Sequence, residues 1–231
     1  MGNPGKVVYP KGYRGFESRS LRRKRAIYLI YNLNMDLSKQ YNDFAKKFSD
    51  VHDQGENSNR DNRKVFYEHI DFLKPGMKLL DVACGDGLDL TYYKTLGAEI
   101  SGIDASEELI AIAKEKNPGA DIRVGSFDKL PFEDASFDIV LSKYAIQTSS
   151  DMAPAFSEMH RVLKSGGTMM YLVTHPFRQY FEKKEADADY FEQKVVDSNI
   201  LNGSIIVKEP SHTMNEYLSD FLFKNFERFL R

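Results

Sequence analysis

The chain has 231 residues, a formal net charge of −2 at neutral pH and enough hydrophobic residues, 42%, for one domain with a well-formed core. Its single cysteine excludes an internal disulfide and fits a reducing compartment, so we expect a cytoplasmic protein. No apolar run is long enough to cross a bilayer, so no membrane-spanning segment is expected.

The charge is uneven along the chain. Residues 1–34 carry a net charge of +7, and residues 35–231 carry a net charge of −9. An acidic folded part argues against a nucleic-acid partner. The basic leader could be a tail for RNA or a membrane, or a signal peptide, but residues 15–19 (GFESR) resemble translated transfer-RNA gene sequence. We therefore expect residues 1–34 to be a disordered or misannotated leader, with translation starting at Met35, and residues 35–231 to form one domain.

Two amphipathic helices are predicted before the first strand, over residues 36–49 and 63–73, because apolar side chains recur there at helical spacing. Residues 54–62 between them are polar and resemble a loop. On the first helix, Tyr41 either packs in the core or covers a ligand pocket.

An apolar run from Met77 to Val82 predicts a buried strand. Two glycines follow, and then a helical pattern over residues 88–96 that Gly97 ends. Gly85 and Gly87 let a ligand approach the backbone, and amides at the start of the helix can bind an anionic group. A strand, a tight glycine turn and a helix in this order are typical of a nucleotide-binding unit.

A second predicted strand, residues 99–104, ends in Asp104 about 20 residues after the glycine turn, where an acidic side chain typically binds ribose hydroxyls. The pair of turns indicates a nucleoside cofactor on a doubly wound sheet. Residues 85–90 lack the third glycine of a dinucleotide site, and Asp86 would repel a pyrophosphate but could accept a hydrogen bond from an ammonium group. With Asp81 as a second acidic group, the charges favour S-adenosylmethionine over NAD.

The rest of the chain continues the alternation of strands and helices, with Ser106 as a predicted N-cap. The further predicted elements are helices at residues 107–115, 151–163 and 213–224, the last with a Thr213–Glu216 capping box, and strands at residues 122–124, 137–141, 168–173 and from 226. The predicted fold is α/β, a doubly wound, Rossmann-like and mostly parallel sheet with helices on both faces, truncated before its last strand.

Residues 177–211 interrupt this alternation with charged and aromatic residues, and residues 205–207 could form a short strand. We expect a lid-like insertion over the crevice at the strand ends. The alternative is a solvated excursion held by a few aromatic side chains.

Several motifs, in this order, resemble those of the class I S-adenosylmethionine-dependent methyltransferases, in the small-molecule branch of types 11 and 25. The matching segments are residues 81–87 (DVACGDG), 104–106 (DAS), 125–132 (GSFDKLPF), 136–142 (SFDIVLS) and 163–167 (LKSGG). The sequence departs from the family pattern at Ala83, where glycine is usual, and at Ser126, where an aspartate usually contacts the adenine amino group.

The resemblance implies one cofactor site at the carboxyl ends of the strands. It places Asp81 and Asp86 at the amino-acid end of the cofactor and Asp104 at the ribose. The other implied cofactor contacts are Tyr41 over the pocket, Ala83, Gly85 and Gly87 in the first turn, Ala105, Ser126 and Phe127 around the adenine, and the backbone carbonyl of Ser142.

Methyl transfer from a sulfonium is an in-line displacement that depends chiefly on alignment and a dry site. If the acceptor must lose a proton, His175 and His212 are the candidate bases, with Tyr144 as a third. The sequence contains no cluster of Cys and His residues that would indicate a metal site. The predicted function is methyl transfer to a small molecule; the alternatives are a non-catalytic cofactor-binding or truncated pseudo-methyltransferase and an NAD-dependent oxidoreductase.

Overall fold

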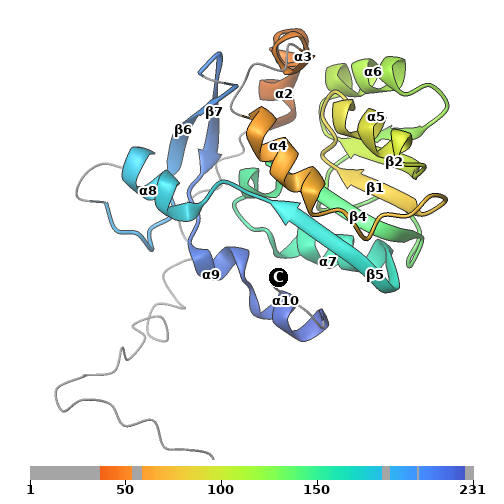
Figure 1. Cartoon of the computed structure of the whole chain (residues 1–231). Coiled ribbons are helices and arrows are strands. Elements are labelled where there is room, and N and C mark those ends of the chain that lie inside the picture. Colours follow the sequence, from red (N-terminus) through yellow and green to blue (C-terminus); the bar gives the residue numbers. More distant parts are fainter. Residues whose placement is uncertain (1–36, 54–58, 184–187, 202, 227–231) are drawn as a thin grey trace, which may run out of the picture. The chain divides into compact units, whose positions relative to one another are not determined.

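A computed structural model describes residues 37–53, 59–183, 188–201 and 203–226 of the chain (Figure 1). The leader expected at residues 1–34 lies outside the described residues, and so does nearly all of the strand expected from residue 226.

Within the described residues, five parallel strands form the central sheet, in the order β3-β2-β1-β4-β5. Their bounds are β1 (Lys78–Val82), β2 (Glu99–Asp104), β3 (Asp121–Val124), β4 (Phe137–Lys143) and β5 (Leu163–Leu172). Because the strands are parallel, their carboxyl ends share one edge of the sheet. The strand order reverses between β1 and β4, and open α/β sheets bind ligands at such a switch point. The predicted doubly wound α/β fold is confirmed.

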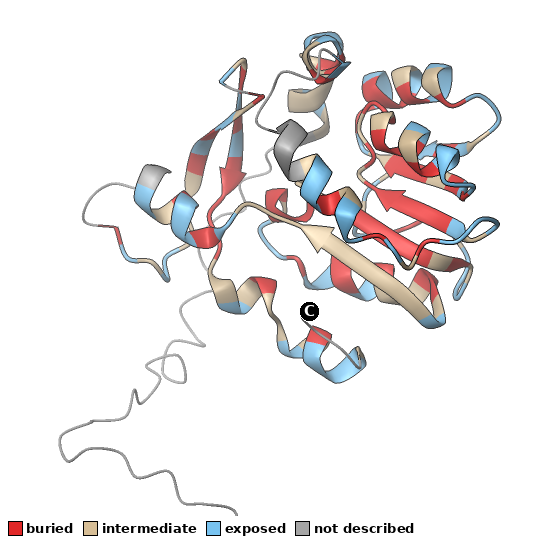
Figure 2. Ribbon diagram, viewed as in Figure 1, coloured by how far each residue is buried: buried red, intermediate tan, exposed pale blue. Residues whose placement is uncertain are grey.

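Helices cover both faces of this sheet (Figure 1). One face packs against α4 (Asn59–Glu68), α5 (Leu88–Thr95) and α6 (Glu107–Lys116), and the other against α7 (Ala153–Val162), α9 (Met214–Tyr217) and α10 (Asp220–Asn225). Alternate strand residues point to opposite faces, so Leu79 belongs to the first core and Leu80 to the second. Figure 2 shows the central strands buried and the edge strand β5 only half-buried.

Local sequence signals set several element ends as predicted. The Ser106 hydroxyl accepts a hydrogen bond from the Leu109 amide at 3.1 Å, which caps α6. Thr213 and Glu216 form the expected capping box at the start of α9. Gly97, with a φ of 87°, follows the end of α5.

Two predicted helices are each divided in two. The segment 36–49 forms α2 (Leu37–Asn42) and α3 (Ala45–Asp53), because the Asn42 side chain leaves the helix to accept a hydrogen bond from the Ser106 hydroxyl at 2.6 Å. The segment 213–224 forms α9 and α10, with Ser219 as the N-cap of the second. Asn and Ser, the residues at these two breaks, favour caps over helix interiors, although the Ser219 hydroxyl itself makes no capping hydrogen bond among the described residues.

The insertion expected at residues 177–211 contains α8 (Pro176–Lys183) and an antiparallel hairpin of β6 (Val195–Ile200) and β7 (Ile205–Pro210). The strand expected at residues 205–207 is therefore confirmed and is longer than predicted. The inner face of the hairpin, with Ile205 and Val207, packs on the aromatic side chains of α2 and α3. Gln40 also joins the two parts, because its Oε1 accepts a hydrogen bond from the Lys208 amide at 2.8 Å.

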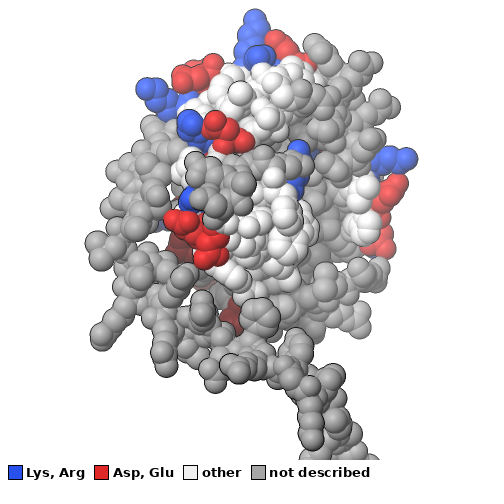
Figure 3. All heavy atoms as spheres, turned by 90° about the vertical axis from the view of Figure 1, so that its left-hand side faces the viewer, with Lys and Arg blue, Asp and Glu red and all other residues white. Residues whose placement is uncertain are grey.

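The surface drawn in Figure 3 mixes charges of both signs, since the described Lys, Arg, Asp and Glu side chains lie among one another there. Within the part of the chain that the structure describes, no helix is both long enough and apolar enough to span a membrane.

Candidate functional site

A cavity of about 360 Å³ opens where the carboxyl ends of the strands face the β6–β7 hairpin. Its walls come from the loops after β1, β2 and β3, the end of β4 with the 3₁₀ turn η2 (Ile146–Thr148), helix α2 and the hairpin. Small-molecule sites typically measure about 300–1,000 Å³ and lie at this kind of sheet edge.

Seven of the eleven residues expected to bind a cofactor line this cavity. They are Tyr41, Ala83, Gly85, Asp104, Ala105, Ser126 and Phe127. Residues from four separate segments thus meet at one place, as the strand-end argument requires.

The two glycines of the first turn serve different purposes. A Cβ added to Gly85 would meet only the Phe48 ring, at 3.7 Å, so this glycine keeps the cavity wall open. A Cβ on Gly87 would lie 2.8 Å from the Ala113 side chain on α6. Gly87 therefore allows close helix packing and does not line the cavity, which differs from the expected ligand access.

Ala83, the departure from the usual glycine, has a φ of 61°. This left-handed conformation is one that glycine adopts freely and alanine does not. The backbone conformation thus gives a physical reason for a glycine at this position.

Asp104 is held firmly at the end of β2. Its Oδ2 accepts a hydrogen bond from the Gly85 amide and its Oδ1 one from the Ser106 amide, both at 2.9 Å. Burial raises the pKa of this carboxyl, and the two amides oppose the rise. Each carboxylate oxygen can accept a second hydrogen bond, so Asp104 can still bind a pair of hydroxyls in the cavity.

Asp86 lies away from the cavity, contrary to its expected place at the amino-acid end of a cofactor. Its carboxylate is fully buried and accepts hydrogen bonds from His52 Nδ1 at 2.8 Å and Lys116 Nζ at 2.7 Å. Burial alone would raise the pKa of Asp86, but His52 and Lys116 lower it by more than burial raises it. The pKa of this carboxyl is therefore well below the usual range. Lys116 also contacts Ser49 and Asp53 on α3, so this network fastens α3 to the glycine turn and α6.

Asp81 and Ser142 are likewise buried in β1 and β4 rather than on the cavity wall. Burial raises the pKa of Asp81, and the neighbouring Asp89 adds to the rise. The next residue of β4, Lys143, does line the cavity and forms an ion pair with Asp89. Neighbouring side chains of a strand point to opposite sides, so the Lys143 side chain reaches the cavity and the Ser142 side chain does not. The contact expected from Ser142 was its backbone carbonyl, and that stays a prediction.

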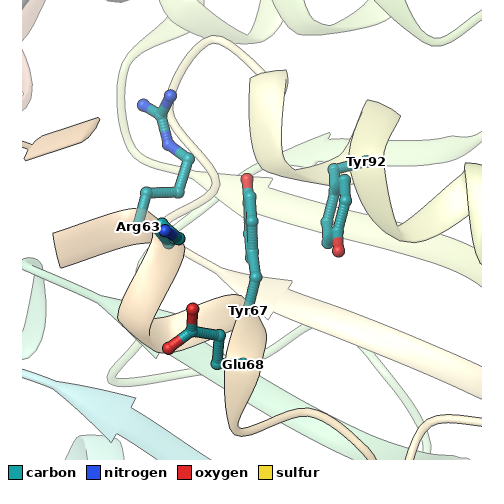
Figure 4. A pocket seen from close by; sticks show the side chains of 5 residues that line it. Arg63, Tyr67, Glu68 and Tyr92 are labelled. Atoms are coloured by element: carbon teal, nitrogen blue, oxygen red, sulfur yellow. The ribbon is translucent and has the colours of Figure 1, made fainter. Parts of the chain in front are cut away.

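Asp89 and Lys143 belong to a buried cluster that sequence reasoning missed. Asp89 also lies 3.2 Å from Arg63 Nε and accepts a hydrogen bond from the Tyr67 hydroxyl. Figure 4 shows Arg63 and Tyr67 at a second, shallower pocket, where the Tyr67 and Tyr92 rings stack with centroids 3.8 Å apart. The cluster fixes α4 against the start of α5. The sequence signal that could have revealed it is Asp89 itself, a charged residue on an otherwise apolar face of α5.

Neither histidine proposed as a base lines the cavity. His175 is exposed, and its Nδ1 accepts a hydrogen bond from the Phe177 amide at 3.2 Å. His212 is buried, and its Nε2 contacts the Gln147 carbonyl at 2.8 Å, which supports η2 from behind. Tyr144, the third candidate, does line the cavity, with a φ of 54°.

Among the other polar residues on the wall, three that carried no expected role are of interest for binding. Asp128 lies beside Ser126, in the motif that lacks its usual carboxylate, and its amide donates to the Ser126 hydroxyl at 3.2 Å. Gln147 lines the wall from η2, and Glu209 lines it from β7. Asp128 could have been found from its place in the third motif, whereas the other two depend on tertiary packing.

Comparison with known proteins identifies a protein family that part of this chain matches. Residues 80–171 match the family described as "Methyltransferase domain". Demethylmenaquinone methyltransferase of Chlorobaculum tepidum is 42% identical over 91 residues, which are 39% of this chain and 38% of that protein. Malonyl-[acyl-carrier protein] O-methyltransferase of Erwinia billingiae is 33% identical over 98 residues, 42% and 39% of the two chains. The match thus spans about two fifths of the length of these relatives.

Solved structures are similar over a larger part of the chain. A putative S-adenosylmethionine-dependent methyltransferase from Listeria monocytogenes aligns with a TM-score of 0.53 and 25% identity, over 65% of this chain and 73% of the other. The PH0226 protein from Pyrococcus horikoshii aligns with a TM-score of 0.51 and 27% identity, over 66% and 76%.

Proposed function

We propose that this chain, which belongs to the class I S-adenosylmethionine-dependent methyltransferases through its domain at residues 80–171, methylates a small-molecule acceptor in the strand-end cavity. S-adenosylmethionine is the cofactor of this family. Methylation of a small-molecule acceptor is our proposal, because the sequence match covers only part of the length of the related enzymes.

The observation that carries the proposal is the placement of Asp104. Two backbone amides fix its carboxylate on the cavity wall, beside the open backbone of Gly85 and near Ser126 and Phe127. A fixed carboxylate at the end of the second strand is the group that binds a ribose in nucleoside sites of doubly wound sheets.

The remaining wall fits S-adenosylmethionine better than a dinucleotide. That cofactor carries positive groups and no phosphate, and the wall presents the carboxylates of Asp104 and Asp128 at the strand ends. When bound, it supplies a methyl group already activated by the sulfonium. We propose that Asp128, which lines the cavity beside Ser126, supplies the carboxylate that Ser126 lacks for the adenine amino group.

The chain's own part in the reaction is to align the acceptor and exclude water. The Tyr41 ring of α2 packs edge to face on Phe44, in the turn between the helices, and on Phe48 of α3. All three rings contact the apolar inner face of the hairpin. These two segments close the cavity on the side opposite the strand ends. In-line transfer needs this dry, shaped space more than it needs a base, in keeping with the two histidines lying off the wall.

Calorimetric titration of the full chain with S-adenosylmethionine, S-adenosylhomocysteine and NAD tests the cofactor part. We expect saturable binding of the first two and none of NAD. Mass spectrometry of a small-molecule panel incubated with the chain and S-adenosylmethionine then tests transfer through a gain of one methyl group. A folded chain that binds neither sulfur compound, or that prefers NAD, would contradict the proposal, and binding without transfer to any acceptor would favour a non-catalytic module.

A further inference from the structure

Glu209 is a carboxylate in a place where the strand pattern calls for an apolar residue. Along β7 the buried positions alternate, and Ile205 and Val207 on the inner face pack on the aromatic residues of α2 and α3. Glu209 is the next inward residue, and its side chain is 3% exposed. The inner face of the hairpin is thus apolar toward its tip and acidic at Glu209, and Ile200, Leu201 and Glu209 all line the cavity.

The hydrogen bonds of Glu209 leave half of its carboxylate unused. Gln179 Nε2 donates to Oε1 at 3.2 Å, and the Ser198 hydroxyl donates to the same oxygen. Oε2 accepts no hydrogen bond from the residues that the structure describes, and none of their Lys, Arg or His side chains forms an ion pair with Glu209. A buried carboxylate with only neutral donors on one oxygen is unfavourable without a positive partner.

The position of this carboxylate points to the acceptor rather than to the ribose. Tyr41 lines the same cavity as Glu209 and Asp104, and both carboxylates add to the rise that burial causes in its pKa. Asp104 marks the strand-end side, and Glu209 belongs to the hairpin on the opposite side. Gln147, Thr148 and Ser198 line the same cavity as Glu209, and these polar side chains suit a small polar molecule.

We propose that Glu209 binds a protonated amine of the methyl acceptor, so that the substrates of this site are small amines. This inference rests on the proposed methyltransferase function and narrows its acceptor class. The ammonium donates to Oε2, and the charge-assisted bond gives the buried carboxylate the positive partner that it lacks.

Matched amines and alcohols test this recognition. The full chain is first saturated with S-adenosylhomocysteine, whose binding is measured by calorimetry. Ethanolamine, n-butylamine and glycine are then titrated against ethylene glycol, n-butanol and glycolate, with binding followed by ligand-observed NMR. We expect at least one amine to bind about tenfold more tightly than its alcohol partner.

Two variants locate the effect. Glu209→Gln keeps the shape and the hydrogen bonds but removes the charge, and it should abolish the preference for amines while S-adenosylhomocysteine still binds. Asp197→Asn is the control, because this exposed carboxylate lies on the outer face of the same hairpin and pairs with Lys208. It should leave the preference unchanged. Circular dichroism establishes that each variant is folded, and the comparison on the unsubstituted chain needs no variant.

The outcomes separate this inference from the proposed function. Failure of S-adenosylhomocysteine to bind overturns the function, and the inference with it. If it binds but no amine is preferred over its alcohol, or if Glu209→Gln keeps the preference, the inference alone is overturned.

Discussion

Ala83 holds a backbone conformation that costs an alanine about 1–2 kcal/mol relative to the right-handed region. Ala83→Gly should therefore raise the free energy of unfolding by about 1 kcal/mol, after the extra chain entropy of glycine is subtracted. Thermal unfolding should show a midpoint about 2–4 °C higher. Ala120→Gly is the control, because its φ is not positive and it should gain nothing. An unchanged or lower midpoint for Ala83→Gly would show that the turn relaxes at no cost.

Asp104 is the residue on which cofactor affinity should depend most. Asp104→Asn removes the charge that accepts ribose hydroxyls and weakens the two backbone bonds that place it, so S-adenosylhomocysteine should bind at least about tenfold more weakly. Calorimetry measures this, with Asp121→Asn as a control at an exposed aspartate on β3. Equal losses in the two variants would mean that Asp104 has no special role.

The same carboxyl predicts a pH dependence of binding. Burial raises the pKa of Asp104, so in the folded chain it takes up a proton at a higher pH than an ordinary aspartate does. Affinity for S-adenosylhomocysteine should fall as the pH drops through that raised value, and more steeply than in Asp104→Asn. Parallel pH profiles for the two proteins would contradict the assignment.

At the scale of elements, α3 is attached to the sheet by the charges around Asp86. Asp86→Asn breaks a buried pair and leaves Lys116 without its nearest buried anion, which should cost about 3 kcal/mol of stability. Hydrogen exchange should show α3 amides opening more often, while α7 on the other face keeps its protection. Loss of protection spread equally over the whole chain would mean that the network does not act on α3.

The sign of the pH effect follows from the lowered pKa of Asp86. The stabilisation is present above the pKa of about 3.9 that an unfolded aspartate has, and it is lost as the pH falls through the lower, folded value. Acid titrations followed by circular dichroism should therefore show the unsubstituted chain losing more stability on acidification than Asp86→Asn does.

The elements themselves were largely predictable, because each strand and helix of the sheet is a local pattern. The strand at residues 78–82, the Ser106 cap and the Thr213 capping box need only neighbouring residues. The place of Asp86 was not predictable, since its partners lie 30 and 34 residues away in the sequence. The same holds for Glu209, whose role depends on which face of a hairpin meets the cavity.

At the scale of the whole molecule, the cavity is closed by two segments from opposite ends of the described chain. Gln40 of α2 bonds to the main chain of Lys208, and Lys47 Nζ donates to the Ser204 carbonyl at 2.6 Å. Ligand binding should therefore protect α2, α3 and the hairpin together. Hydrogen exchange with and without S-adenosylhomocysteine should show this joint protection, with α10 unaffected as the internal control. Protection of only one segment would mean that they do not close the site as a unit.

Gln40 and Lys208 are 168 residues apart in the sequence, so the ribosome makes the two segments that close the cavity at different times. All five strands of the parallel sheet end by residue 172, so they can pair while the hairpin is still inside the ribosome. The aromatic side chains of α2 and α3 lack their packing partners in the hairpin until residues 195–210 emerge from the ribosome. The newly made chain thus gains a closed cavity only after the strands of its sheet can pair, so ligand capture belongs to a later stage of its folding.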